Sequence, residues 1–426
     1  MKITVEMILK KIIYILNENS DMMKDHAEKV SYIYLKLLQE KGYSLDEIVY
    51  LLFISLLHDI GVYKLTDDKN DNVEIKKILK FESESIHEHS IYGYLFIKNF
   101  APKPMQKYAK IILHHHFRYI DYEKIDKELL EESQLLYLAD RVSVYIDKNK
   151  KIDFNVLNKY RDINFKGEYI DLLQKVNKKV NIAKVLRKSN YKEEIFSKLR
   201  NAILNEKYQN EILEMIVAMV DIKSPYTMYH NINVTGVAKE LAKVVGLSEE
   251  EVLEVEAAAR IHDIGKVVVP VEILEKNGKL TKDEFEIMKQ HITKGRIILD
   301  GVCPVEKMML ATTHHEKLDG SGYPDGIAGK DLDIKKRVLC IADIISALIG
   351  KRSYKDEFDK ETIIKILQED ASKNKIDKNI VEIFIKNYDL IIEKVKLNCK
   401  YELGKYNIYR MEYEAIKKHM EKYNFM

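Results

Sequence analysis

A long internal repeat constrains the fold of this chain more than any other feature of its sequence. Residues 25–61, which begin DHAEKV, and residues 229–265, which begin YHNINV, both end in His-Asp-Ile-Gly. In each copy a histidine near the start, His26 or His230, lies 32 residues before the histidine of that ending. Unrelated segments would not share this spacing, so we interpret the repeat as a duplicated structural unit.

Helical signals recur at matched positions in both copies. Gly42 and Gly246 each follow the first histidine by 16 residues, where a helix C-cap is expected. Ser44 with Glu47, and the matching pair in the second copy, have the spacing of a capping box that starts the next helix. The first helix of the second copy carries apolar residues with helical periodicity, at Val234, Val237, Ala238, Leu241, Ala242 and Val245.

The match continues downstream through side chains that can ligate metals. The paired positions are His89 with His291, His115 with His314, His116 with His315, and Asp140 with Asp343. Alternating runs of β-branched residues are absent, so we predict an all-α protein built from two tandem helical domains. We place the N-terminal domain, with a helical connector at its end, at residues 1–205, the second domain at 206–390, and a helical tail at 391–426.

Composition limits the classes of function. A chain of 426 residues is too long for one hydrophobic core. Its 70 Lys and Arg residues against 68 Asp and Glu residues give a net charge of +2, which does not predict binding to DNA or RNA. Three widely spaced cysteines indicate a reducing compartment and argue against a disulfide framework or a thiolate zinc site.

The N-terminal segment does not have the pattern of a targeting sequence. It lacks the long apolar core and the small-residue cleavage site of a signal peptide. No run in the chain approaches the ~20 apolar residues that a membrane span requires. We therefore expect a soluble, cytoplasmic protein without a membrane partner.

The histidines indicate metal chemistry. Of the 13 histidines, 10 fall into two matched sets of five, and each set is accompanied by two aspartates. One histidine on an apolar helix is more often a hydrogen-bonded core residue, but ten in register are not explained in that way. Neutral imidazoles and carboxylates suit Mn²⁺, Fe²⁺ or a similar divalent ion. Asp263, next to His262 at a helix end, is placed to bridge two such ions.

A paired-metal site has a natural task in phosphate chemistry. Two ions about 3.5–4 Å apart hold a bridging hydroxide and clamp a phosphate during in-line attack. Lys266 lies one helical turn past His262, where its ammonium group would reach the phosphoryl oxygens or the leaving group. A solvated lysine at a helix end is the alternative interpretation of that residue.

The ordered set of motifs in the second copy resembles a known family. HDIGK at 262–266, HHEKLDGSGYPDG at 314–326 and RVLCIADIISAL around Asp343 together resemble the HD-GYP domain. HD-GYP domains are a family of cyclic di-GMP phosphodiesterases within the HD superfamily of metal-dependent phosphohydrolases. The resemblance covers roughly residues 220–390 and implies an enzyme of second-messenger signalling.

The resemblance also implies roles for individual residues. One metal ion would be held by His230, His262, Asp263 and Asp343, and the other by Asp263, His291, His314 and His315. Asp263 would bridge the two ions, and Lys266 would stabilise the transition state. Arg352 and Lys355 would grip the substrate phosphates.

Two further features follow from the same resemblance. Gly322, Tyr323 and Pro324 belong to the glycine-rich loop, which would shape the pocket over the bound phosphate, with Tyr323 stacking on a base. Tyr226 stands where some family members carry a glutamate that binds a third metal, so we expect two ions, of iron or manganese. Ser346 replaces a usual aspartate, which affects the substrate contacts more than the metals.

The N-terminal copy keeps the ligands and loses the groups that would handle phosphate. The retained ligands are His26, His58, Asp59, His89, His115, His116 and Asp140. Val62 replaces the lysine after HDIG, FRYIDYEK replaces the Gly-Tyr-Pro loop, and Asn149 stands where the second copy has Arg352. We therefore expect a further metal site with an accessory role, regulatory or structural; action on a different phosphate compound is the alternative.

Two classes of function remain open at this point. The first is an enzyme whose C-terminal domain hydrolyses cyclic di-GMP by attack of a metal-bridged hydroxide, with cyclic GMP-AMP or another nucleotide phosphate as the alternative substrate. The product, a linear dinucleotide or GMP, is undecided. The second is a non-catalytic di-metal sensor, against which Lys266, Arg352 and Lys355 argue. Either class is compatible with a homodimer or a signalling partner.

Overall fold

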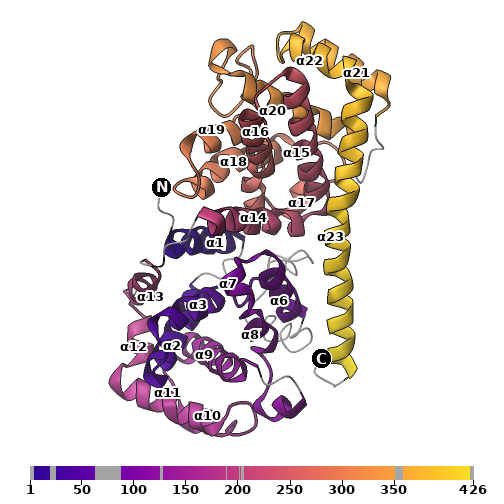
Figure 1. Cartoon of the computed structure of the whole chain (residues 1–426). Coiled ribbons are helices and arrows are strands. Elements are labelled where there is room, and N and C mark those ends of the chain that lie inside the picture. The colour runs from indigo at the N-terminus through magenta and orange to yellow at the C-terminus, as the bar shows by residue number, and fades with distance from the viewer. Residues whose placement is uncertain are drawn as a thin grey trace. The chain divides into compact units, whose positions relative to one another are not determined.

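The computed structural model describes residues 4–19, 25–62, 88–124, 128–188, 190–200, 202, 206–350 and 358–422. Within these residues the regular structure is helical and contains no strand (Figure 1). The predicted all-α fold is therefore confirmed. In this part of the chain no helix is both long enough and apolar enough to cross a membrane.

The chain divides into two compact units. The N-terminal unit comprises Lys2–Ile212 together with Tyr409–Met426, and the C-terminal unit comprises Leu213–Ile408. The last helix, α23 (Tyr388–Lys422), therefore contributes its first part to the C-terminal unit and its last part to the N-terminal unit.

The helices of the N-terminal unit precede α14 in the chain. They are α1 (Val5–Asn19), α2 (His26–Lys41), α3 (Leu45–Leu56), α6 (Glu88–Phe100), α7 (Lys103–Gln106), α8 (Ala109–His114), the 3-10 helix η1 (Tyr119–Lys124), α9 (Leu130–Asn149), α10 (Phe154–Asn158), α11 (Gly167–Lys179), α12 (Ile182–Leu186) and α13 (Tyr191–Leu199). α13 packs on α2 and α3, so the basic stretch that ends this part of the chain is integrated into the unit.

The C-terminal unit begins within α14. Its helices are α14 (Glu206–Lys223), α15 (Pro225–Val245), α16 (Glu249–Ile261), η2 (Ile264–Val268), α17 (Val271–Leu274), α18 (Lys282–Leu299), α19 (Val305–Ala311), η3 (Gly329–Asp331), α20 (Ile334–Ile349), α21 (Lys360–Ser372), α22 (Lys378–Lys386) and the start of α23.

Local sequence signals account for the ends of the repeated helices. Gly42 and Gly246 follow α2 and α15 with φ angles of 86° and 91°, in the left-handed region that favours glycine. Ser44 and Ser248 each form a complete capping box with the glutamate three residues later. These predicted caps are confirmed.

Each unit is organised around the long helix that carries the first histidine of its repeat. α15 packs against α16 and α20, and α2 packs against α3 and α9. The faces that meet are apolar, and residues such as Val234 and Leu241 on α15 are completely buried. This packing holds the ligand-bearing ends of the helices in fixed positions.

A close backbone approach joins the HDIG motif to the next ligand-bearing helix in both units. A Cβ atom on Gly265 would lie 1.8 Å from the carbonyl oxygen of His291, and one on Gly61 would lie 1.9 Å from that of His89. Only glycine fits at such distances. The motif therefore packs directly on α18 or α6, which brings its aspartate next to the histidine of that helix.

Candidate metal centre and substrate pocket

The structure brings all seven predicted ligands of the C-terminal unit into one buried cluster. Five elements supply them: His230 comes from α15, His262 and Asp263 from the end of α16, His291 from α18, His314 and His315 from the turn after α19, and Asp343 from α20. His315 and His230 are the most accessible of the imidazoles, and the other three are almost completely buried.

Asp263 lies at the centre of the cluster. Its Oδ2 atom is 3.6 Å from Nε2 of His230 and 3.1 Å from Nε2 of His262. Its Oδ1 atom is 3.4 Å from Nε2 of His291 and 3.8 Å from Nε2 of His314. The two oxygens of one carboxylate thus face two different groups of histidines, which is the arrangement that a bridging ligand requires.

Asp343 complements this arrangement from the opposite helix. Its Oδ1 atom lies 3.0 Å from Nε2 of His230, and its Oδ2 atom lies 3.7 Å from Nδ1 of His315. Both aspartates therefore contact imidazole nitrogens with both of their oxygens.

Backbone hydrogen bonds fix which nitrogen of three histidines faces the cluster. Nδ1 of His262, His291 and His314 lies 2.7, 2.6 and 2.8 Å from the carbonyl oxygen three residues earlier in the chain. A carbonyl oxygen only accepts hydrogen bonds, so each neutral ring carries its proton on Nδ1 and turns the lone pair of Nε2 toward the cluster. Metal-ligating histidines are commonly held in this way.

The cluster contains polar atoms that lack partners among the described residues. Nε2 of His262 and Oδ1 of Asp263 are buried without a hydrogen bond. Nε2 of His291 and Nε2 of His314 face each other at 3.4 Å, although both carry lone pairs in the tautomers described above. Buried polar atoms without partners are costly, and a divalent cation between these atoms would satisfy them. The residues therefore fit a pair of divalent ions.

Burial and charge set the protonation of these ligands. Burial is the main cause that lowers the pKa of His291 to about 3 and that of His315 to about 4. Burial raises the pKa of the Asp263 carboxyl, but His262 and Lys266 outweigh it and hold that pKa well below its usual range. For His262, burial lowers the pKa, but the Asp263 carboxylate outweighs it and raises that pKa. The site thus offers carboxylates and mostly neutral imidazoles, the forms that bind metals.

Lys266 lies at the border between the ligands and a pocket above them. It belongs to η2, and its ammonium group hydrogen-bonds to Oδ2 of Asp263. Its side chain also lines the pocket. A cation in this position can neutralise charge that develops on a phosphate group.

The glycine-rich loop is held in shape by Glu316. The buried carboxylate of Glu316 accepts hydrogen bonds from the backbone N–H groups of Asp325 at 2.8 Å and Ile327 at 3.0 Å. A Cβ atom on Gly322 would lie 2.4 Å from Cα of Glu316, so this position of the loop requires glycine.

The loop places Tyr323 beside the ligands. The backbone N–H of Tyr323 donates to the carbonyl oxygen of His315 at 3.2 Å, and the two rings lie 4.7 Å apart. Tyr323 lines the pocket, whereas Gly322 and Pro324 are absent from the lining and build the loop behind it. The peptide bond between Tyr323 and Pro324 is cis.

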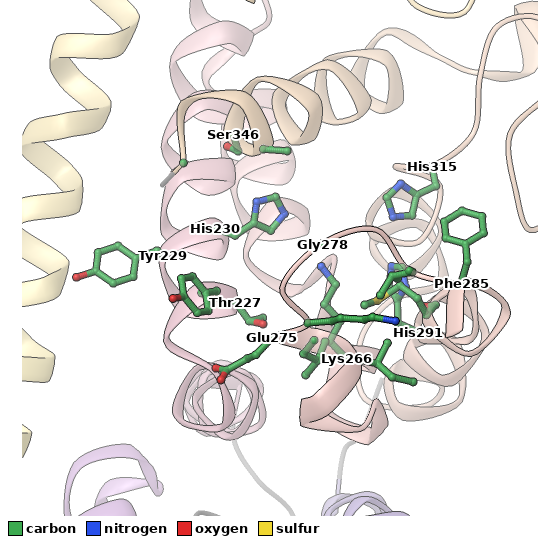
Figure 2. Close-up of a pocket in the computed structure, with 18 of the residues that line it drawn as sticks. Thr227, Tyr229, His230, Lys266, Glu275, Gly278, Phe285, His291, His315 and Ser346 are labelled. Atoms are coloured by element: carbon green, nitrogen blue, oxygen red, sulfur yellow. The ribbon is translucent and has the colours of Figure 1, made fainter. Parts of the chain in front are cut away.

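The pocket opens over the cluster, where His230, His291 and His315 form part of its wall (Figure 2). Sequence reasoning did not identify the side chains that form much of the remaining wall, among them Tyr229, Glu275, Phe285 and Met288. No motif marks Glu275, Phe285 or Met288, and the spacing of Phe285 and Met288 is that of an ordinary apolar helix face, so no sequence signal set them apart. Arg352 and Lys355 lie outside the described residues, so their contact with substrate phosphates stays a prediction.

The two positions at which the sequence departs from the family also line the pocket. They are Tyr226 and Ser346. The Ser346 hydroxyl is buried and has no hydrogen-bond partner among the described residues. The serine contributes to the pocket wall, but its hydroxyl oxygen itself is buried.

The N-terminal unit brings its seven predicted ligands together with almost the same geometry. Five matched distances, each between a histidine ring nitrogen and an aspartate carboxylate oxygen, differ by 0.2 Å or less between the two units. The N-terminal distances are 3.2 Å (His26–Asp140), 3.3 Å (His58–Asp59), 3.6 Å (His89–Asp59), 3.7 Å (His115–Asp59) and 3.8 Å (His116–Asp140). The matched C-terminal distances, in the same order, are 3.0 Å (His230–Asp343), 3.1 Å (His262–Asp263), 3.4 Å (His291–Asp263), 3.8 Å (His314–Asp263) and 3.7 Å (His315–Asp343). This cluster also fits divalent ions, because Nε2 of His58 and Nε2 of His115 are buried without hydrogen-bond partners in the described chain.

The surroundings of the N-terminal cluster are different. Arg141 donates from Nη2 at 2.6 Å and from Nε at 3.0 Å to Oδ2 of Asp140, whereas the residue after Asp343 is Ile344. In the segment that replaces the glycine-rich loop, Phe117 and Tyr122 are buried in an apolar cluster, whose other core residues are Ile91, Leu95, Tyr413 and Met420. Two of these residues come from the end of α23, so the tail of the chain completes the packing of this unit.

Comparisons with protein families identify both repeats. Residues 213–380 match a family model described as an HD domain, and residues 23–145 match a second model with the same description. The two matched ranges contain both ligand clusters.

Two curated relatives illustrate the range of similar proteins. The chain is 26% identical to 3′3′-cGAMP-specific phosphodiesterase 1 of Vibrio cholerae, over 85% of this chain and 87% of the relative. It is 36% identical to a cyclic di-GMP phosphodiesterase of Thermotoga maritima, over 42% of this chain and 50% of the relative, so it spans about half of that protein.

A solved structure shares the fold along most of the chain. The crystal structure of a cyclic GMP-AMP specific phosphodiesterase of V. cholerae aligns with a TM-score of 0.55 and 18% identity, over 92% of this chain and 99% of that one.

Proposed function

The chain carries two HD domains, and we propose that the C-terminal one is an HD-GYP phosphodiesterase that hydrolyses a cyclic dinucleotide. One observation carries this proposal: the two groups of ligands bridged by Asp263 lie directly beneath a pocket whose wall also contains Lys266. A binuclear centre with an adjacent cation in an accessible pocket is suited to phosphate ester cleavage.

The metal ions would be held by the cluster in two groups. His230, His262 and Asp343 would hold one ion, His291, His314 and His315 would hold the other, and Asp263 would contact both. When bound, two such ions supply an activated water and neutralise the charge of a phosphate group. Ligands of this type suit iron or manganese, which we propose as the native metals.

The residues of the chain contribute the remaining chemistry. Lys266, which lines the pocket beside the metal ligands, would neutralise negative charge on the phosphate group of the bound dinucleotide. Tyr323, held by the glycine-rich loop, would limit the space above His315 and exclude water from one side.

Cyclic di-GMP is the substrate that we propose first, from the resemblance of the loop and the HD pair to HD-GYP domains. A second candidate is 3′3′-cGAMP, which the similarity to the Vibrio enzyme along most of the chain favours. Both molecules present a phosphodiester to the metals and two purine bases to the pocket walls.

For the N-terminal HD domain we propose an accessory metal site. Its ligand distances match those of the C-terminal unit, but Val62 replaces the lysine, and the loop segment is used for packing. Its role would therefore be structural or regulatory, and it would not hydrolyse the same substrate.

Turnover by the metal-loaded protein tests these proposals. The full chain would be purified without oxygen, loaded with Fe²⁺ or Mn²⁺, and offered cyclic di-GMP and 3′3′-cGAMP side by side. We expect Asp263→Ala to abolish hydrolysis and the matched variant Asp59→Ala to retain it. If neither dinucleotide is cleaved while both sites hold metal, the enzyme proposal fails, and a di-metal sensor becomes the better description.

A further inference from the structure

The pocket of the C-terminal unit has two chemically different ends. Figure 2 shows Glu275 on one side, near Thr227, and Phe285 on the other, with Lys266 and His291 between them. Three of the proposed metal ligands, His230, His291 and His315, also line the pocket. A substrate whose phosphate is held at the centre would therefore direct its two bases toward two unlike environments.

At one end, the Glu275 carboxylate is not engaged by the protein. Its side chain is half-buried, it lines the pocket, and it forms no hydrogen bond or ion pair with a described residue. The neighbouring Lys276 is paired with Glu284, whose Oε1 atom lies 2.7 Å from the ammonium nitrogen. Glu275 also lies outside every group of metal-ligating atoms in the described chain. Its carboxylate is thus available to a ligand.

We propose that Glu275 reads a guanine base of the substrate, an inference that rests on the proposed hydrolysis of a cyclic dinucleotide. An ionised carboxylate only accepts hydrogen bonds, and its two oxygens match the adjacent N1–H and N2–H donors on the Watson–Crick edge of guanine. Adenine presents an acceptor, N1, beside a single amino group, so one carboxylate oxygen would face a lone pair. A site built for a hydrogen-bonding partner discriminates strongly against an analogue that lacks it.

The other end of the pocket accepts a base by stacking. Phe285 is 45% exposed, which leaves a large ring surface free to contact a ligand. Its ring lies 6.2 Å from that of Tyr323, and the ammonium group of Lys289 lies 5.3 Å from the Phe285 ring centre. Stacking on aromatic rings tolerates any base. The geometry therefore requires guanine at one position only, and accepts guanine or adenine at the other.

Binding selectivity tests this assignment without depending on turnover. The metal-loaded full-length protein would be titrated with slowly hydrolysed phosphorothioate analogues of cyclic di-GMP, 3′3′-cGAMP and cyclic di-AMP. The variant is Glu275→Gln, whose amide offers one donor and one acceptor and so pairs with adenine. The matched control is Glu272→Gln, which removes the same charge from an exposed position of α17.

We expect the wild-type protein to prefer both guanine-containing analogues over the cyclic di-AMP analogue. Glu275→Gln should reduce that preference about tenfold or more, because one bidentate pair carries this much discrimination. Glu272→Gln should leave it unchanged. An unchanged preference in Glu275→Gln would overturn the inference, and so would equal binding of all three analogues by the wild type.

Hydrolysis of the natural dinucleotides, measured in parallel, separates the two proposals. Selective binding that depends on Glu275, without hydrolysis, would retain the guanine contact and reject the phosphodiesterase. Hydrolysis with selectivity independent of Glu275 would retain the phosphodiesterase and reject the guanine contact. No binding of any analogue by the wild type would reject both.

Discussion

Asp263 and Asp59 hold equivalent places in the two units, but their surroundings differ. The Asp263 side chain is 2% exposed and Lys266 lies against it, whereas Asp59, with Val62 at the position that corresponds to Lys266, is 15% exposed. The ligand distances are nearly the same in both units. The comparison indicates that the duplicated fold sets the positions of the metal ligands. A few residues outside the ligand set, such as Lys266, would then determine which reaction a bound metal pair supports.

The segments after the histidine pairs show the same division. In the C-terminal unit, Glu316 accepts two backbone hydrogen bonds and holds a loop that forms part of the pocket wall. In the N-terminal unit, the residue at this position is Phe117, which is buried with Tyr413 and Met420 of the tail. One copy uses this segment to build a pocket, and the other uses it to bury apolar surface.

The largest expected difference between the units concerns Lys266. Lys266→Ala should lower kcat by about 10²–10³-fold, the usual effect of removing one group that stabilises developing charge. Metal content should not change, because Lys266 is not a ligand. The matched variant Val62→Ala should leave kcat unchanged. Steady-state kinetics and metal analysis of both variants check this, and an equal loss in both would remove the distinction between the units.

The glycine of the HDIG motif should be equally important in both units. Gly265→Ala and Gly61→Ala would each place a Cβ atom within 2 Å of a carbonyl oxygen, at 1.8 and 1.9 Å respectively. We expect each to destabilise its own unit by about 3 kcal/mol and to weaken metal binding there. Chemical denaturation with metal analysis measures both effects. A mild effect of Gly61→Ala alone would show that the close backbone approach of Gly61 to α6 is not equivalent to that of Gly265 to α18.

The tail should matter to the stability of the N-terminal unit more than to catalysis. Tyr413 is 7% exposed, and its ring stacks on that of Tyr92 at 4.3 Å. Tyr413→Ala should therefore cost about 2–3 kcal/mol of unfolding free energy. Met411→Ala is the control, because Met411 is 71% exposed on the same helix. Denaturation curves that coincide for the two variants would contradict the packing described here.

The smallest effect is expected at Glu316. Glu316→Gln keeps the volume of the side chain but replaces two charge-assisted acceptors with one neutral acceptor, at a cost of about 1–2 kcal/mol. Since the loop carries Tyr323, KM should rise more than kcat falls. A change confined to kcat would instead assign Glu316 a role closer to the reacting atoms.

Much of the fold and of the ligand set could be predicted from the sequence, because the helix ends have local signals and the ligands recur at matched positions in two copies. Caps such as Ser44 and Gly42 have local causes, and the ten histidines are found by register alone. The pocket wall is different, since Glu275 and Phe285 reach it only through the packing of α17 and α18. The stacking of Tyr413 on Tyr92 joins residues far apart in the chain, and the periodicity of apolar residues within a helix does not predict such a contact.

Metal content measured together with turnover tests most directly whether the two units share ligand geometry but not activity. Wild type, Asp59→Ala and Asp263→Ala would be purified without oxygen, and bound iron or manganese would be counted per chain. We predict that each variant loses about half of the metal, while only Asp263→Ala loses hydrolysis of the cyclic dinucleotide. An Asp59→Ala variant that keeps all of its metal, or that loses hydrolysis as completely as Asp263→Ala, would contradict this division of roles.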